Sequence, residues 1–455
     1  MYSNNPPRYM DTLENRLQKR MHVSLYALLV LTMLLAISIL LEGCSDSCDI
    51  KSEYVYLEPV YTTVAELRAS IDVTAPKPIN AVGQIYIKDN FLFVNDPGKG
   101  IHIIDNQDPA HPAPKKFLKI PGNFDLAIKG NTLYADSYID LIAFDISNIN
   151  NVKETGRLEG IFKNYRSFGI ATDVNCCVIT DWVEKKTVYL SESDCDVNMQ
   201  PWGGVYYEGG IAFNNMAADL SSKATVNPGS GSGPGIGGSL ARFTINGDHL
   251  YMLDGGDLQV ADITGESTPV AKSRSYISWD IETIFPYKEN LFIGSASGMH
   301  ILDVSAPESP VKLSTYEHVR SCDPVVVDDK YAYVTLRSGT MCQGFTNQLE
   351  IINVENLSSP QLLKTYPMTN PHGLGIDNNT LFICDGSDGL KAFDAADINS
   401  IDKNLLAHYK NINARDVIPF NNTLIMIGEE GLFQYDYSNP KDIKLLSTIA
   451  IHNEN

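Results

Sequence analysis

The sequence predicts an all-β protein in which one four-stranded unit recurs about eight times, or alternatively about seven. A five-residue strand that ends in an acid or its amide returns along the chain, and most copies lie about 40 to 50 residues apart. Asn, Asp, Pro and Gly, which supply turns, stand at the junctions between the strands. No sustained helical periodicity follows residue 50, which argues against a helical solenoid. The copies are Ile101 to Asp105, Leu141 to Asp145, Leu258 to Asp262, Met299 to Asp303, Leu349 to Asn353, Leu390 to Asp394 and Leu432 to Asp436.

The first unit is complete between Gln84 and Ile120. Its turns are Asp89-Asn90 and the hairpin loop Asn95 to Gly100, both rich in residues that accept turn conformations. Four antiparallel strands per unit is the pattern of a β-propeller blade. The four strands are Ile85 to Ile87, Phe91 to Val94, Ile101 to Ile104 and Lys115 to Ile120.

The third unit is degenerate. Ser167 to Ala171, Cys176 to Asp181 and Thr187 to Leu190 fit its first three strands, and an insertion at 192–238 follows. The end of this insertion, Asn227 to Gly238, is a Gly, Ser and Pro stretch that predicts a flexible loop. Counting the degenerate unit gives eight blades, and treating it as a decoration of a neighbour gives seven.

The N-terminus has the parts of an export signal. The uncharged run Val23 to Leu41 follows a basic flank, and Leu41 to Cys44 is similar to a bacterial lipobox in which Cys44 is lipidated. Glu42 departs from the small or apolar residue usual there, and the run is nearly long enough for an uncleaved signal anchor. We expect a signal at 1–43, a tether with closing strands at 44–80 and a propeller at 81–455.

Charge and cysteines exclude some classes of function. The formal net charge of −20 disfavours nucleic acid as a partner. Export allows disulfides, and Cys322 with Cys342 is the expected pair. Cys195 is expected to join Cys176 or Cys177, and Cys384 is expected to be a buried thiol. No CxxC pair with partner histidines supports a zinc site, so no metal or cofactor is expected.

Strand register yields a candidate site. The first strand of each blade lines the central channel, so residues at its start face the channel mouth. Counting back from each second strand places Glu282, Asp323, His372 and Arg415 at one level, with Asp125 and Arg242 one residue away. These side chains would bind a small polar ligand or a cation. The alternative is that they neutralise one another in a water-filled channel.

Two further acidic series favour structural roles. The acids that end the recurring strand are expected to form turns, because an Asp at a strand end accepts a hydrogen bond from the amide two residues later. The hairpin acids are expected mainly to form turns, with calcium binding as the alternative. They are Asp96, Asp136, Asp181, Asp254 and Asp385.

The recurring strand resembles the repeat of the LVIVD-repeat family of bacterial envelope β-propellers, for instance in Ile101-His-Ile-Ile-Asp105. That resemblance implies a propeller and assigns no catalytic residue. We expect a monomeric, lipid-anchored binding or scaffold module of the outer membrane, on its periplasmic or outer side. Its partner would be an envelope protein or a small polar ligand, bound by the channel face and the insertion at 192–238. The alternative is a hydrolase or lyase that uses Glu282, Asp323 and His372.

Overall fold

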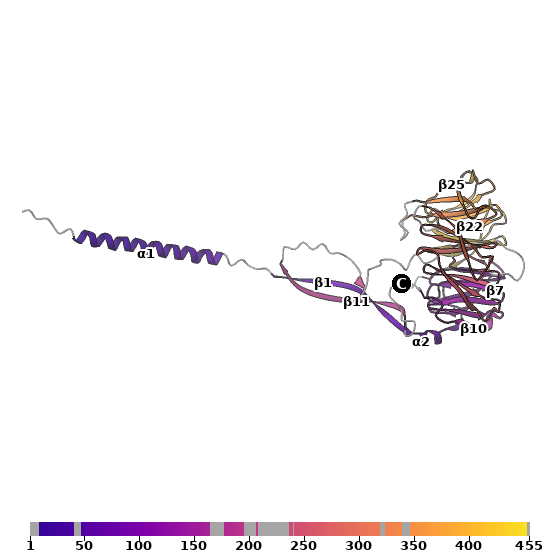
Figure 1. The fold of residues 1–455 in the computed structure, drawn as a ribbon, viewed down its shortest axis with the longest axis horizontal. Coiled ribbons are helices and arrows are strands. Elements are labelled where there is room, and N and C mark those ends of the chain that lie inside the picture. The colour runs from indigo at the N-terminus through magenta and orange to yellow at the C-terminus, as the bar shows by residue number, and fades with distance from the viewer. Residues whose placement is uncertain are drawn as a thin grey trace, which may run out of the picture. The chain divides into compact units, whose positions relative to one another are not determined.

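The computed structural model describes residues 9–40, 47–163, 177–194, 206–207, 236–239, 241–318, 324–338 and 346–452. The chain divides into two compact units. One comprises Met1–Glu58 with Glu184–Ala212, and the other comprises Pro59–Val183 with Phe213–Asn455. Figure 1 labels their elements.

The first unit contains the long helix α1 (Tyr9–Leu40) and strand β12 (Tyr206–Tyr207). It also holds the outer parts of β1 (Ser47–Thr63) and β11 (Cys177–Asp194). In their sheet β1 lies between β11 and β12 and is parallel to β12. Among the described helices, none combines the length and apolar character needed to cross a membrane.

The predicted eighth blade is absent from the described residues. Cys177–Asp194 is one continuous strand that joins β1, where the sequence predicted two strands of a degenerate blade. The pairing with β1 removes this strand from the ring, and the segment Trp182 to Thr187 contains no Gly, Pro, Asn or Asp that would turn the chain. The count of about eight blades is therefore wrong, and the alternative of seven is confirmed.

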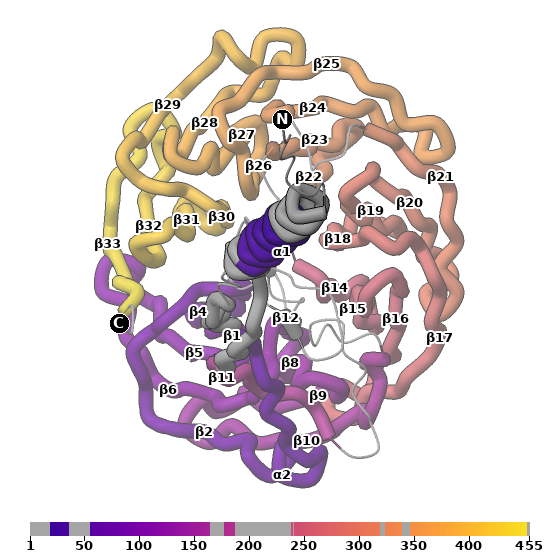
Figure 2. The backbone as a smooth tube through the Cα atoms, turned by 90° about the vertical axis from the view of Figure 1, so that its left-hand side faces the viewer, coloured from indigo at the N-terminus to yellow at the C-terminus, as the bar shows by residue number. Residues whose placement is uncertain are grey.

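The second unit is a ring of seven blades within the described chain, each built on four antiparallel strands (Figure 2). Blade 1 holds β3 (Ile85–Lys88), β4 (Phe91–Asp96), β5 (Gly100–Asp105) and β6 (Ala113–Lys119), and blade 2 holds β7 (Leu126–Lys129), β8 (Thr132–Ser137), β9 (Asp140–Asp145) and β10 (Lys153–Leu158). Blade 3 holds β14 (Phe243–Asn246), β15 (His249–Asp254), β16 (Asp257–Asp262) and β17 (Val270–Tyr276), and blade 4 holds β18 (Ile281–Tyr287), β19 (Asn290–Ser295), β20 (Gly298–Asp303) and β21 (Val311–Glu317). Blade 5 holds β22 (Val325–Asp328), β23 (Tyr331–Leu336), β24 (Gln348–Asn353) and β25 (Gln361–Pro367), and blade 6 holds β26 (Leu374–Asp377), β27 (Thr380–Cys384), β28 (Leu390–Asp394) and β29 (Leu405–Tyr409). Blade 7 holds β30 (Ala414–Phe420), β31 (Thr423–Gly428), β32 (Gly431–Asp436) and β33 (Lys444–Ala450), and short 3-10 turns lie at η1 (Ile149–Asn151) and η2 (Ile401–Lys403).

The residue that ends each third strand, an Asp in six blades and Asn353 in blade 5, is a turn former, as predicted. In all seven blades its side-chain oxygen accepts a hydrogen bond from the backbone N–H two residues later, at 2.7 Å to 3.1 Å. These bonds lower the pKa of several of the carboxyls, that of Asp262 to about 2. The strand ahead of each acid is buried and forms the middle of the blade.

The N-terminal part of the second unit lies against blades 1 and 2. Helix α2 (Val64–Ala69) starts at a capping box between Thr63 and Glu66, where the sequence predicted further strand. Strand β2 (Asp72–Thr74) then pairs with β6 and extends blade 1 at its outer edge. Residues 77–80, which we call the strap, follow β2 and lead back to β3.

Packing between blades 1 and 7 closes the ring. Apolar side chains of blade 1, such as Leu92, share one buried cluster with Ile425 and other side chains of blade 7. Asn106 and Gln434 exchange two amide hydrogen bonds of 2.8 Å and 2.7 Å across the same junction. The first and last blades are thus joined mainly by side chains.

The end of the insertion crosses the central channel. Strand β13 (Ile236–Gly237) pairs with β3, the inner strand of blade 1. Two residues later, Ser239 accepts a hydrogen bond from the backbone N–H of Leu374 in blade 6 and donates one to Asp416 in blade 7. Because all three partners belong to inner strands, residues 236–239 lie inside the channel.

Candidate functional site

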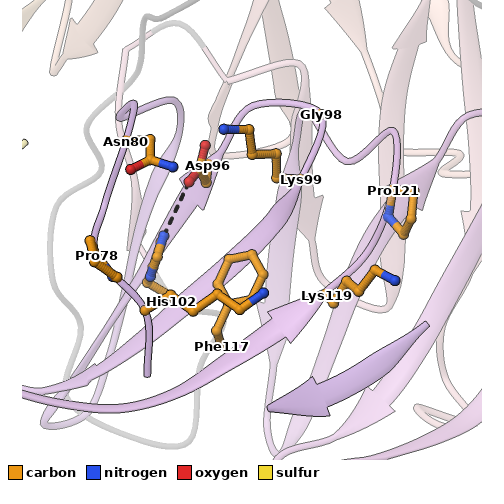
Figure 3. Close-up of a pocket in the computed structure, with 10 residues that line it drawn as sticks. Pro78, Asn80, Asp96, Gly98, Lys99, His102, Phe117, Lys119 and Pro121 are labelled. Atoms are coloured by element: carbon orange, nitrogen blue, oxygen red, sulfur yellow. Dashed lines mark hydrogen bonds and ion pairs between the residues drawn. The ribbon is translucent and has the colours of Figure 1, made fainter. Parts of the chain in front are cut away.

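A cavity of about 450 Å³ lies on one face of blade 1, and we call it the blade-1 pocket (Figure 3). Its walls combine amino groups, one acid, one imidazole and apolar rings. This mixture of charged and apolar groups is typical of a ligand site. The lining residues are Lys77, Pro78, Asn80, Asp96, Gly98, Lys99, His102, Phe117, Lys119 and Pro121.

Strand register brings the floor of the pocket together. His102 in β5 pairs directly with Phe117 in β6, and their rings lie 4.7 Å apart. Lys119 follows Phe117 by two positions and so emerges on the same face of the sheet. The strap lies over this face, with the ammonium of Lys77 4.9 Å from the centre of the Phe117 ring.

The hairpin between β4 and β5 supplies the acid. Nε2 of His102 lies 3.4 Å from Oδ2 of Asp96, and the two side chains face each other in Figure 3. Asp96 is only 2% exposed, and its other oxygen, Oδ1, is buried without a hydrogen-bond partner in the part of the chain that the structure describes. A buried acceptor without a donor costs free energy, so Oδ1 favours a ligand that carries an N–H or O–H group.

Three lysines surround this acid. Lys77, Lys99 and Lys119 form no ion pair within the described chain, whereas Lys88 and Lys115 of the same blade do. The pocket is therefore locally positive on a protein whose net charge is −20. An anion would find unpaired ammonium groups here.

Blade 6 shows how an equivalent acid is satisfied elsewhere. Asp385 occupies the hairpin position of Asp96 and is 0% exposed. It accepts backbone N–H groups from Thr369 at 3.0 Å and Asn370 at 2.7 Å. Lys391, which stands at the strand position of His102, binds it at 2.5 Å. The segment that leads into blade 6 thus saturates this carboxylate.

Blade 1 lacks that arrangement because its leading segment takes another path. The strap is held by blade 7, since Ile79 pairs with Ile451 and its carbonyl accepts the N–H of His452 at 2.7 Å. Oδ1 of Asp96 accepts no N–H from it. In blade 6, the backbone N–H groups of Thr369 and Asn370 lie beside the equivalent acid. In blade 1, the blade-1 pocket lies beside Asp96 instead.

A second cavity of about 530 Å³ adjoins the blade-1 pocket, and we call it the apolar annex. The two share Lys77, Pro78 and His102 in their walls. The remaining walls of the annex come from both closing blades and are mainly apolar. They are Ile79, Ile104, Ala110, Pro112, Pro114, Ser447, Thr448, Ile449, Ala450 and His452.

Comparison with known families decides what kind of propeller this is. The LVIVD repeat matches residues 81–116, which contain β3 to β5, and residues 320–368, which contain β22 to β25. This chain is a β-propeller that contains LVIVD repeats. A comparison with curated proteins finds no match.

Solved structures resemble this propeller only distantly. The computationally designed protein Ika8 has 8% identity and a TM-score of 0.47, over 81% of this chain and 88% of that chain. BamB from Moraxella catarrhalis has 11% identity and a TM-score of 0.43, over 84% and 91%. PorZ, a surface component of the type-IX secretion system of Porphyromonas gingivalis, has 10% identity and a TM-score of 0.44, over 82% and 39%. At these values the similarities carry no argument about function.

Three residues of the predicted channel site lie near the start of inner strands of the LVIVD-repeat propeller. Glu282 is half-buried at a bulge of β18. His372 is half-buried with Nε2 3.3 Å from Nδ2 of Asn370, and Arg415 forms an ion pair with Glu429. Their joint binding of a ligand stays a prediction.

Asp125 and Arg242 contribute to the joint between blades 2 and 3. Oδ2 of the buried Asp125 accepts the backbone N–H groups of Arg242 at 2.5 Å and Phe243 at 3.1 Å. Burial raises the pKa of the Asp125 carboxyl, although these hydrogen bonds act in the opposite direction. The guanidinium of Arg242 donates to the Leu253 carbonyl. The contacts of Asp125 are those of a group that holds two blades together.

Other predicted sites fall outside the described residues. They are Asp323 of the channel set, the Cys322 and Cys342 pair, and the lipidation site Cys44. The pairing of Cys195 also stays a prediction, because Cys195 and Cys176 lie outside as well. Cys384 is a buried thiol, as predicted.

Sequence reasoning missed the blade-1 pocket. Asp96 was expected to be a turn former, and His102 was noted only as part of the repeated strand. One signal was present, since a histidine interrupts the apolar run Ile101 to Ile104 and occupies a buried position. The strap could not be placed over the blade from sequence, because its position depends on the closure of the ring.

Proposed function

We propose that this LVIVD-repeat propeller is an envelope-anchored binding module whose ligand occupies the blade-1 pocket. One observation carries the proposal. The buried Oδ1 of Asp96 has no partner among the described residues, and Asp96 lines a cavity together with lysines that form no ion pair with those residues. Such a site selects a ligand that bears both a negative charge and a hydrogen-bond donor.

The chemistry of the walls favours binding over catalysis. The side chains that line the blade-1 pocket include no hydroxyl or thiol that could act as a nucleophile. His102 and Asp96 form a pair, but acyl or glycosyl transfer requires a further group placed against the reacting atom. The pocket is therefore best suited to hold a ligand without changing it.

Binding is tested by a thermal-shift screen of the full chain against glucuronate, glucose, N-acetyl-leucine, acetate, short peptides and divalent ions. We expect at least one anionic compound to raise the melting temperature of the wild type. The double variant Lys77→Gln/Lys119→Gln should lose that shift. Lys116→Gln is the matched control, because Lys116 lies in the same strand but on the opposite face from Phe117. A shift that survives in the double variant, or no shift with any compound, would overturn the proposal.

The anchor is the second part of the proposal, and the N-terminal sequence supports it. A basic flank, the uncharged run Val23 to Leu41 and Cys44 have the order of a lipoprotein signal. We expect radiolabelled palmitate to be incorporated into the wild type and not into Cys44→Ser, and the protein to fractionate with outer membranes. Equal labelling of the wild type and Cys44→Ser would contradict the proposal that Cys44 carries a lipid anchor.

A further inference from the structure

We infer that the ligand of the blade-1 pocket is the C-terminal end of a peptide with apolar side chains. This inference rests on the proposed binding function and adds the class of ligand. A peptide C-terminus combines a carboxylate, the backbone N–H of the same last residue and side chains that project beside them. The two adjoining cavities present a matching group for each of these parts.

The carboxylate matches the lysines. Lys77, Lys99 and Lys119 line one cavity and are not engaged in ion pairs with described residues. A carboxylate bound there would gain charge-assisted hydrogen bonds that these ammonium groups do not make within the described chain. The net charge of the protein is strongly negative, so most of its surface repels an anion. The lysines make the blade-1 pocket a favourable place for an anion to bind.

The backbone N–H matches Asp96. In blade 6 the equivalent acid, Asp385, accepts two consecutive backbone N–H groups from the chain itself, those of Thr369 and Asn370. In blade 1 the acid retains a buried oxygen with no donor. A bound peptide supplies the same kind of donor from outside, and so completes in blade 1 the arrangement that blade 6 makes internally. An inorganic anion without an O–H group, such as chloride or sulfate, has no such donor and would be repelled by Asp96.

The apolar side chains match the annex. It adjoins the blade-1 pocket through Lys77, Pro78 and His102, and Ile79, Ile104 and Ile449 are among its remaining walls. Burial of an aliphatic side chain there contributes affinity in proportion to the area removed from water. A sugar acid would satisfy the lysines and Asp96 but would leave this second cavity unused.

Fluorescence anisotropy with the full chain tests the inference. The probe is the peptide Gly-Ser-Gly-Ala-Ile-Leu, labelled at its N-terminus and free at its C-terminus. Two matched probes each remove one group: the first carries a C-terminal amide, and the second is N-methylated at its last residue. We expect each to bind at least about tenfold more weakly than the free acid, about 1.4 kcal/mol. A probe with Ser and Gly in place of Ile and Leu should also bind about tenfold more weakly.

Variants connect these differences to the pocket. In Lys77→Gln/Lys119→Gln the preference for the acid over the amide should fall below about threefold, whereas Lys116→Gln should keep it in full. Equal affinity for acid and amide in the wild type would overturn the inference. If glucuronate produces a lysine-dependent thermal shift and the peptides do not bind, the proposed function stands and the peptide assignment fails. If no compound and no peptide binds, both fail.

Discussion

The guanidinium of Arg68 donates two hydrogen bonds to the carboxylate of Asp140, 72 residues later in the chain. Nε lies 2.7 Å from Oδ2 and Nη2 lies 3.0 Å from Oδ1. Asp140 also accepts bonds from Arg157 at 2.9 Å and from the N–H of Gly160 at 2.9 Å, and its side chain is fully buried. Through this carboxylate, helix α2 is fixed to blade 2.

The first prediction is that Asp140→Ala destabilises the propeller more than Arg68→Gln does. Removal of Asp140 leaves the half-buried Arg157 without its buried anion, and we expect a loss of about 3 to 5 kcal/mol in the free energy of unfolding. Arg68→Gln removes charge-assisted bonds but leaves Arg157 on Asp140, so the loss should be about 1 to 2 kcal/mol. Denaturant unfolding measures both. Equal losses would contradict this role of Asp140.

The second prediction concerns pH. Burial acts to raise the pKa of Asp140, but the hydrogen bonds from Arg68, Gly160 and Arg157 outweigh it and hold the pKa below its usual value. A depressed pKa stabilises the fold fully above the unfolded-state value of about 4, and this contribution is lost as the pH falls through the folded-state value.

The free-energy gap between the wild type and Asp140→Asn should therefore narrow when the pH is lowered from about 5 to about 3. Denaturant unfolding at the two pH values gives the gap directly, and other carboxylates cancel because both proteins contain them. A gap of constant size would show that this carboxylate does not titrate as inferred.

The third prediction tests the closure of the ring. Gln434 is fully buried and exchanges two amide hydrogen bonds with Asn106 across the junction of blades 1 and 7. Gln434→Leu leaves the amide of Asn106 without its partner, and we expect a loss of about 1 to 3 kcal/mol. Gln361→Leu is the control, because Gln361 is exposed in an outer strand and its change should cost less than about 0.5 kcal/mol. Similar losses for the two variants would argue against this closure.

The fourth prediction compares two glycines with positive φ. Gly100 shapes the hairpin that carries Asp96, with φ of +144°, and an added Cβ would lie 2.1 Å from the carbonyl oxygen of Leu118. Gly247 has φ of +60° and no atom within 4 Å of such a Cβ. Gly100→Ala should cost more than about 2 kcal/mol and Gly247→Ala about 1 kcal/mol, as thermal or denaturant unfolding will show. If Gly247→Ala destabilised the protein more than Gly100→Ala, the close approach of the Leu118 carbonyl oxygen to Gly100 would not determine the cost of the substitution there.

Strand-level features were predictable because they depend on neighbours in the sequence. The strand predicted at Phe91 to Val94 is observed at Phe91–Asp96, and the strand that ends at Asp105 is observed at Gly100–Asp105, with the predicted hairpin between them. Each is set by side-chain period and turn chemistry, which act over a few residues. The same local rules predicted that Asp105 and its equivalents form turns.

The site was less predictable, because it depends on contacts between distant segments. Counting along strands placed Glu282, His372 and Arg415 near inner-strand starts, yet it could not reveal that Ser239 occupies the channel beside Asp416. The count of blades failed for the same reason, since only the pairing of β11 with β1 removes Cys177–Asp194 from the ring.

By itself, the sequence determined that this protein is a propeller of repeated four-stranded blades, because period, turns and terminal acids are encoded within each unit. The tertiary structure alone decided where an acid would lack a donor. Asp96 and Asp385 stand at the same place in their repeats, but the segment before blade 6 comes from another blade, while the strap before blade 1 is held by the last blade. Ring closure is a long-range event, and the blade-1 pocket is its consequence.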